Sequence, residues 1–438
     1  MKQSFFLLLS VVLFVSCQRA EEKAAASDLS ATTELREKIQ DYFSALNELG
    51  KFNGVVYASK DGMDIIHQAY NLHPEKSSTT YVSPESQFDI HSVSKLMARY
   101  LIEKYELERK LSKRQFIHAF FPDFPNGEKI TIEMLLHHTS GLPRELEGVE
   151  GDAIDLTSEQ ILAHAKKQAL LFEPGTDKQY SNVGYEIVYF IIQQISEKSF
   201  AQCLSDDLFK PLDMQHSGAH FYTRDNKRKN LAKNHEKGDS TILQVDNVSS
   251  DELKTARIFS TATDLNKFLN HLRQEPYASL LKDESDVIEK SGGSDGIRVE
   301  VYTHLKHNYN FIFLANYEEV PFQQTVEDFA NILEGKAYDI PKALNRTAIV
   351  LPSAALQKYV GTYSFADLGK LELTFEVEGT NLVVWQEGEQ IASLRAESET
   401  VFFDDPKEPA SFEFIDNEKG EFDVLMGFKG VKLKGVKQ

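Results

Sequence analysis

At residues 88–97 the chain reads FDIHSVSKLM, an extended run that we expect to enter a helix at Ser92. Positions i and i+3 share a helix face, so the Lys95 ammonium can lie beside the Ser92 hydroxyl. The helical period continues in apolar residues at Val93, Leu96, Met97, Tyr100, Leu101 and Tyr105. This pattern predicts a helix with one long buried face, which would hold its first turn rigidly.

A serine beside a shielded lysine is a candidate nucleophile. The Ser92 hydroxyl is weakly reactive at its own pKa, and a lysine kept from water can be neutral enough to take its proton. The alternative is that Ser92 only caps the helix and that Lys95 is only solvated. The same Ser-x-x-Lys spacing occurs at Ser279 and Lys282, so the pair carries meaning only with partners elsewhere in the chain.

The composition is that of a soluble globular protein, with 438 residues, 41% hydrophobic and 26% charged. This length allows one large domain and one small domain with ample core. The formal net charge of −19 repels phosphate backbones and no basic stripe is visible, so we expect no nucleic-acid partner.

The N-terminus reads as an export signal. Lys2 precedes an apolar run at 5–15 that only Ser10 interrupts, and small residues precede Cys17. This end resembles a bacterial lipobox, which implies that residues 1–17 are a lipoprotein signal peptide and that Cys17 carries lipid. An uncleaved signal anchor is the alternative. Residues 18–33 are polar and alanine-rich and predict a flexible tether, so we expect a lipid-anchored protein of a bacterial cell envelope, periplasmic or surface-exposed.

Neither the two cysteines nor the adjacent pair of histidines indicates a metal site. Cys203 falls on an apolar helical face and is expected to be a buried thiol, and two cysteines leave no disulfide framework or zinc cluster. The adjacent His137 and His138 point about 100° apart on a helix and lack a His-Glu-x-x-His pattern, which favours a structural role.

Two further stretches carry polar groups suited to a cleft. Tyr180 and Asn182 precede an apolar helix, where the phenol can face a cleft and the amide can donate to a substrate carbonyl, unless Asn182 is only the helix N-cap. Lys290-Ser291-Gly292-Gly293 lies beside a predicted strand, where missing side chains let a substrate approach the backbone. The alternative for this segment is a simple glycine turn.

The remaining pattern predicts a mixed fold followed by a separate β unit. Helices are expected at 34–49, 252–272 and 322–333, and strands at 52–59, 63–70, 299–304 and 309–316. A linker at 337–350 follows. From 371 to 378 apolar and polar residues alternate with period two, so 351–438 is expected to be a small all-β, barrel-like unit.

Together the three motifs resemble the penicillin-recognising serine hydrolases, most closely the class C β-lactamase, D-alanyl-D-alanine carboxypeptidase and esterase group. The motifs stand in the order Ser92-x-x-Lys95, Tyr180-x-Asn182 and Lys290-Ser291-Gly292. The resemblance implies an α+β fold over 34–336, with an antiparallel sheet flanked by helices and a helical subdomain. The unit at 351–438 is similar to the accessory domain often appended to such proteins.

By this resemblance Ser92 would attack a carbonyl and form an acyl-enzyme, while Lys95 and Tyr180 move the proton. Asn182 would orient the acyl side chain and Lys290 would supply positive charge. Ser291 would bind a substrate carboxylate, Gly292 would line the cleft, and the backbone amides of Ser92 and Gly293 would form the oxyanion hole. No metal or organic cofactor is required, and the expected substrates are peptidoglycan-derived D-amino-acid peptides, β-lactams or small esters.

The sequence departs from the family pattern near this cleft. His91 stands where relatives often have glycine, and Arg257-Ile258-Phe259 replaces a glycine-rich run. Substrate access is therefore expected to differ from that of a working β-lactamase. Two other functions also stay open: a binding or sensor lipoprotein that uses the same cleft without turnover, and a structural envelope protein whose β unit does the binding. The sequence predicts no oligomeric state.

Overall fold

The computed structural model describes residues 31–149, 156–219, 230–238, 241–245, 257–366, 371–417, 420–428 and 431–438. The signal peptide predicted at 1–17, with Cys17, lies outside the described residues, as does the tether up to residue 30. A helix covers 31–48, so the last three residues assigned to the tether are helical. Within the described ranges, no helix has both the length and the apolar character needed to cross a bilayer.

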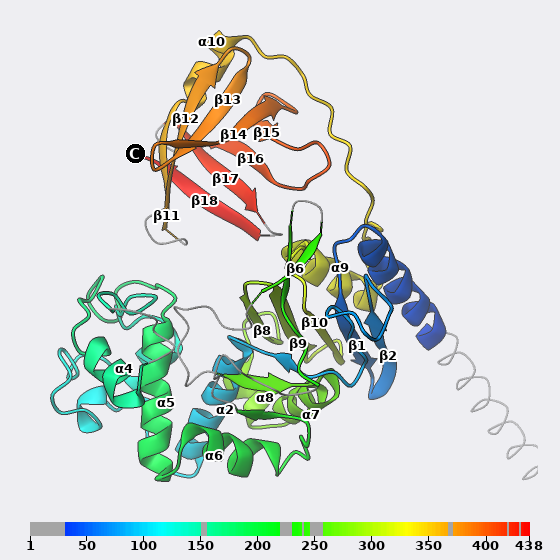
Figure 1. The fold of residues 1–438 in the computed structure, drawn as a ribbon. Helices are drawn as coiled ribbons and strands as arrows, with labels where there is room; N and C mark the ends of the chain where they lie inside the picture. Colours follow the sequence, from blue (N-terminus) through cyan, green and yellow to red (C-terminus); the bar gives the residue numbers. More distant parts are fainter. Residues whose placement is uncertain are drawn as a thin grey trace, which may run out of the picture.

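An antiparallel five-stranded sheet forms the centre of the larger unit, with the order β2-β1-β10-β9-β8 (Figure 1). Its strands are β1 (Gly54–Lys60), β2 (Met63–Tyr70), β8 (Val287–Ser294), β9 (Ile297–His304) and β10 (Tyr309–Ala315). The turn between β1 and β2 places Asp61 and Gly62 at φ angles of 52° and 79°, the left-handed pair that a tight hairpin requires.

Helices cover both faces of this sheet (Figure 1). Successive side chains of β1 point to opposite faces of the sheet. On one face, Val56 and Ala58 join the core formed with helix 31–48 and α9 (Phe322–Glu334). Val55 and Tyr57 join the core formed with α2 (Val93–Leu107) and α7 (Ala262–Leu272). The predicted antiparallel sheet flanked by helices is confirmed.

A helical region adjoins α2 and carries the second motif. It contains α3 (Ile132–Leu136), α4 (Ser158–Ala165), α5 (Asn182–Ser196) and α6 (Phe200–Leu204). Helix α5 is apolar on most sides, and ten of its residues are buried, because α2, α3, α4 and α6 all pack against it.

The helix predicted at 252–272 is partly wrong. Ile258–Ser260 forms strand β7, which pairs with β3 (Phe88–Asp89) and β4 (Gly218–Ala219). The helix begins only at Ala262, because the Thr261 side chain accepts the Asp264 N–H and caps it. The start of the predicted segment, 252–256, lies outside the described residues. Strand β7 thus pairs with β3, the short strand that leads into α2.

The C-terminal unit is a closed barrel of eight strands, preceded by α10 (Ser353–Leu356) (Figure 1). The strands are β11 (Gly361–Phe365), β12 (Leu371–Glu378), β13 (Asn381–Gln386), β14 (Glu389–Ala396), β15 (Val401–Phe403), β16 (Ser411–Asp416), β17 (Phe422–Phe428) and β18 (Val431–Lys437). Pairing of β11 with β18 closes the barrel around an aromatic core. The predicted α+β class with a C-terminal all-β unit is confirmed.

The barrel contacts the larger unit through Glu408. This carboxylate lies 2.7 Å from the Lys51 ammonium, which also lies 3.0 Å from Glu319, and it pairs with Lys237 of β5 (His235–Lys237). Residues 336–348, between α9 and the barrel, carry no helix or strand.

Candidate active site

Ser92 occupies the N-cap position of α2, but its hydroxyl does not cap the helix. Instead, Ser92 Oγ accepts hydrogen bonds from Tyr180 OH at 2.9 Å and from Lys95 Nζ at 3.2 Å. The capping alternative for Ser92 is therefore wrong. By contrast, Ser279 of the second Ser-x-x-Lys occurrence donates to Glu275 at 2.7 Å on the exposed surface.

Tyr180 is held by the chain that leads into α5. The N-cap of this helix is Ser181, whose hydroxyl accepts the Gly184 N–H at 2.9 Å and donates to the Pro143 carbonyl at 2.6 Å. Asn182 is thus the first helical residue, and its reading as N-cap is wrong. This double anchor fixes the backbone beside Tyr180 and aims the phenol at Ser92.

Positive charge surrounds the phenol of Tyr180. Lys95 Nζ and Lys290 Nζ lie 5.3 and 5.2 Å from the centre of its ring. Burial raises the pKa of Tyr180, but the two lysine charges and the hydrogen bonds to Ser92 and Lys95 act in the opposite direction, and the pKa ends below its usual value. Burial has the opposite effect on the ammonium of Lys290, whose pKa it lowers. The site therefore favours a phenolate more than water does.

His138 is a member of the site that sequence reasoning did not place there. Its ring centre lies 4.4 Å from that of Tyr180, and its Nδ1 accepts the Ser181 N–H at 3.1 Å. Burial, reinforced by Lys290 and Lys95, lowers the pKa of His138 to about 3. The ring is consequently neutral and positions Tyr180. Because 42 residues separate the two rings, no local spacing shows this contact.

The third motif lies directly against the backbone at Ser92. A Cβ at Gly292 would lie 2.3 Å from the Ile90 carbonyl oxygen and 3.2 Å from the Ser92 nitrogen. The segment is part of the edge strand β8, so the reading as a simple glycine turn is wrong. Gly293 follows in the same strand and pairs with Arg298 of β9.

Ser291 lies opposite Glu300 of β9, and its hydroxyl donates to Glu300 Oε2 at 2.6 Å. Glu300 is 1% exposed. Burial raises its pKa to about 8, although the Ser291 bond opposes this change. Sequence reasoning missed Glu300, which lies in an ordinary alternating strand. The Ser291 hydroxyl is thus already engaged, and a substrate carboxylate would have to compete with Glu300 for it.

The Asn182 amide is also engaged, because its Nδ2 donates to Glu145 Oε1 at 2.5 Å. Glu145 lies on the loop that follows α3, beside Arg144, whose guanidinium carbon is 5.1 Å from the Tyr180 ring centre. The amide nitrogen carries two N–H donors, so a substrate carbonyl can accept the second one while Glu145 keeps the first.

The two departures from the family pattern contact each other. His91 has a φ of 44°, a conformation that glycine adopts without strain. Its Nδ1 lies 3.1 Å from Arg257 Nη1, and both residues are buried. Burial and the Arg257 charge lower the pKa of His91 to about 3, so the neutral ring accepts this bond. The pair supports the turn beneath Ser92.

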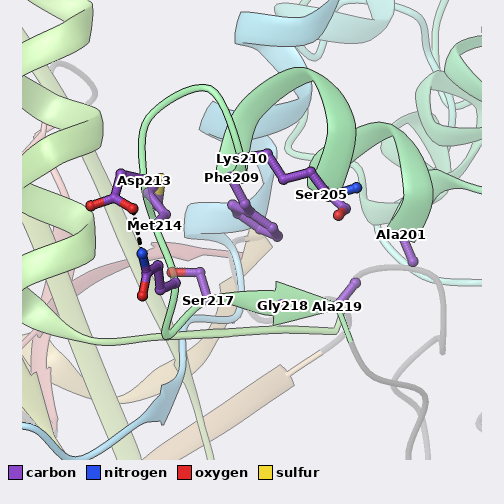
Figure 2. Close-up of a pocket in the computed structure, with 10 residues that line it drawn as sticks. Ala201, Ser205, Phe209, Lys210, Asp213, Met214, Ser217, Gly218 and Ala219 are labelled. Carbon is purple, nitrogen blue, oxygen red and sulfur yellow. Dashed lines mark hydrogen bonds between the residues drawn. The ribbon is translucent and has the colours of Figure 1, made fainter.

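A cavity of about 500 Å³ lies elsewhere, between α6 and β4 (Figure 2). Its lining includes Phe209, Lys210, Asp213, Met214 and Gly218. None of the described residues that line it belongs to the predicted site. The residues predicted for catalysis lie instead where α2, the start of α5 and β8 meet.

Comparison with known proteins identifies the same family. A family model described as Beta-lactamase matches residues 39–299. Penicillin-binding protein 4* of Bacillus subtilis (strain 168) is 24% identical over 425 residues, covering 84% of this chain and 91% of that protein. The octameric penicillin-binding protein homologue from Pyrococcus abyssi has a TM-score of 0.59 at 18% identity, covering 91% of this chain and 99% of its own.

A class C beta lactamase has a TM-score of 0.57 at 16% identity, covering 69% of this chain and 98% of its own. At these identities the two structures establish the fold alone. The family match over more than half of the chain, together with this fold, shows that the chain belongs to the beta-lactamase family, whose members are generally serine hydrolases.

Proposed function

We propose that this protein is an exported, lipid-anchored serine hydrolase that forms an acyl-enzyme on Ser92. Its substrates are D-amino-acid peptides, β-lactams or small esters. The observation that carries the proposal is the contact of Ser92 Oγ with both Tyr180 OH and Lys95 Nζ, at 2.9 and 3.2 Å.

In the acylation step Ser92 Oγ attacks the substrate carbonyl carbon and passes its proton to Tyr180, whose pKa is lowered by the flanking lysines. Lys95 stabilises the phenolate before the transfer and can relay the proton afterwards. The C–N or C–O bond then breaks, and the leaving group takes the proton. Deacylation repeats these steps with water as the nucleophile.

The backbone amides of Ser92 and Gly293 form the oxyanion hole in this proposal. The approach of Gly292 to within van der Waals reach of the Ile90–Ser92 backbone supports the assignment. Each such donor is worth about 3 kcal/mol of barrier. Lys290 attracts a substrate carboxylate when one is present, and Asn182 orients the acyl side chain through the amide N–H that does not bind Glu145.

The test compares the wild-type chain with Ser92→Ala, Tyr180→Phe and, as a matched control, Ser279→Ala from the chance motif. A short-chain ester, a D-alanyl peptide and a penicillin serve as substrates. We expect Ser92→Ala to abolish turnover, Tyr180→Phe to reduce it by at least about a hundredfold, and Ser279→Ala to retain it. Turnover that persists in Ser92→Ala would exclude the proposed nucleophile.

The anchor is tested separately, through Cys17. We expect the native protein to be in the membrane fraction of a bacterial host and to carry a lipid mass on an N-terminal Cys17. We expect the Cys17→Ser variant to be released from the membrane. An unmodified Cys17 in a chain that still begins at Met1 would favour the uncleaved signal anchor instead.

A further inference from the structure

We propose that His304, His307 and Glu334 bind a zinc ion at the end of the sheet remote from Ser92. One ligand atom from each of these residues lies within 4.8 Å of those of the other two. His304 ends β9, His307 lies in the turn before β10, and Glu334 ends α9. His307 follows His304 by three residues, and Glu334 follows His307 by 27. No local sequence motif therefore predicts that the three side chains lie together.

The buried imidazole of His304 lacks the partners that a buried polar ring needs. The residue is 9% exposed, and its Nδ1 is buried without a hydrogen-bond partner. Its Nε2 lies 3.9 Å from Glu334 Oε1, too far for a hydrogen bond. The His307 ring lies across it, with ring centres 4.3 Å apart and planes at 76°. A cation between the ring and Glu334 would give Nε2 a partner and would offset the carboxylate charge.

Neighbouring groups orient Glu334 in the way that supports metal ligands. Tyr309 OH donates to Glu334 Oε1 at 2.8 Å, which fixes the carboxylate beside the two rings. The Lys336 ammonium lies 2.5 Å from the other oxygen, Oε2. Oε1 can therefore bind a metal while Oε2 keeps its ion pair, although the lysine charge weakens the attraction for a cation.

The donor set decides which metal fits. Two imidazole nitrogens and one carboxylate oxygen suit zinc, whereas calcium and magnesium prefer oxygen ligands alone. Tetrahedral zinc places its ligand atoms ~3.4 Å apart, so the cluster must contract by about an ångström. His307 is exposed in a turn and can move, and a water molecule would take the fourth position.

Such an ion would act on stability and not on the reaction. His304 pairs with Val287, whereas Gly292 pairs with Val299 five residues away along β9, a separation of ~17 Å. The ion would join the end of α9 to the β9–β10 turn and so fasten the helix to the sheet. Zinc should consequently raise the thermal stability of the protein by mass action.

The experiment titrates Zn²⁺ into the full-length chain, purified without a histidine tag in mild detergent and freed of metal by a chelator. Calorimetry should give one Zn²⁺ per chain, and Co²⁺ in its place should give the visible absorption of a tetrahedral site. His304→Ala should abolish binding, and His307→Ala and Glu334→Gln should weaken it at least tenfold. The control His118→Ala, at an exposed histidine outside the cluster, should bind as wild type.

A further variant tests the effect of the Lys336 ammonium, which competes with the metal ion for Glu334. Lys336→Gln should tighten zinc binding by about two- to fivefold, the worth of a surface ion pair. Absence of stoichiometric Zn²⁺ binding in the wild type would overturn the proposal. So would equal affinity in the wild type and the exposed His307→Ala variant, a comparison that holds even if His304→Ala fails to fold.

Discussion

Replacing Lys290 by glutamine tests the proposal that Tyr180 acts as a base. The ammonium of Lys290 lies 5.2 Å from the Tyr180 ring centre and lowers the pKa of the phenol. A cation stabilises the phenolate, so its removal must raise this pKa. If the phenolate is the active form, the acid limb of the pH–rate profile moves to higher pH in Lys290→Gln.

The size of the effect follows from the geometry. Over 5.2 Å, a unit charge contributes about 3 kcal/mol at an effective dielectric constant of ~20 and about 0.8 kcal/mol in bulk water. Since ~1.4 kcal/mol corresponds to a factor of ten, we expect acylation at neutral pH to slow by roughly 4- to 200-fold. At high pH, where the Tyr180 phenol is almost fully ionised in both proteins, the variant should approach the wild-type rate.

The assay is acylation by a short-chain ester between pH 5 and 10. An ester without a carboxylate separates the effect on Tyr180 from any role of Lys290 in substrate binding. Lys198→Gln is the matched control, because Lys198 pairs with Asp206 beyond the far end of α5. An acid limb in Lys290→Gln that coincides with that of the control would refute the assignment of Tyr180 as the base.

Three further changes probe the contacts around the site. Gly292→Ala would drive a methyl group against the Ile90 carbonyl oxygen, which a Cβ meets at 2.3 Å, and should lower the acylation rate at least about a hundredfold in the same ester assay. Glu300→Gln mimics the neutral carboxyl: the Glu300 pKa of about 8 exceeds its unfolded value, so its contribution to stability is present below pH ~4.5 and lost towards pH ~8. Urea unfolding of this variant should match wild type near pH 4 and show a gain of about 2–4 kcal/mol at pH 8.5; equal stability of the two proteins at pH 8.5 would show that folding does not raise the pKa of Glu300. His138→Ala should reduce kcat by roughly tenfold evenly from pH 5 to 9, because the His138 pKa is about 3; a ratio of wild-type to variant kcat that changes around pH 6.5 would contradict a neutral ring in the wild type.

The parts of the fold that sequence could predict are those with a strong local period. The apolar spacing along α5 and α9 and the alternation along β12 are each visible within one element. Helix α9 and strand β12 appear close to the expected bounds, and α5 follows Tyr180 as the expected apolar helix. The segment at 258–260 was expected to be helical, but it pairs with two short strands from distant parts of the chain. Tertiary pairing overrides local preference there.

The candidate site likewise contains residues that the sequence predicted and residues that only the structure revealed. Ser92, Lys95, Tyr180 and Lys290 were found from short motifs, and the structure brings them together. His138, Glu145 and Glu300 carry no motif of their own, and each becomes part of the site only through a contact made across at least nine residues of sequence. Such residues set the pKa values and the hydrogen bonds of the motif residues, and only the folded arrangement reveals them.

The central claim is that Ser92 forms a covalent intermediate, and intact-mass spectrometry with peptide mapping tests it most directly. The full-length chain is mixed with a penicillin, a D-alanyl peptide and a short-chain ester, with Ser92→Ala in parallel. We predict an added acyl mass on the peptide that contains Ser92, followed by its loss as product appears, and no such mass in Ser92→Ala. A permanent adduct would favour a sensor or binding protein, and the absence of an adduct with all three compounds would contradict the account.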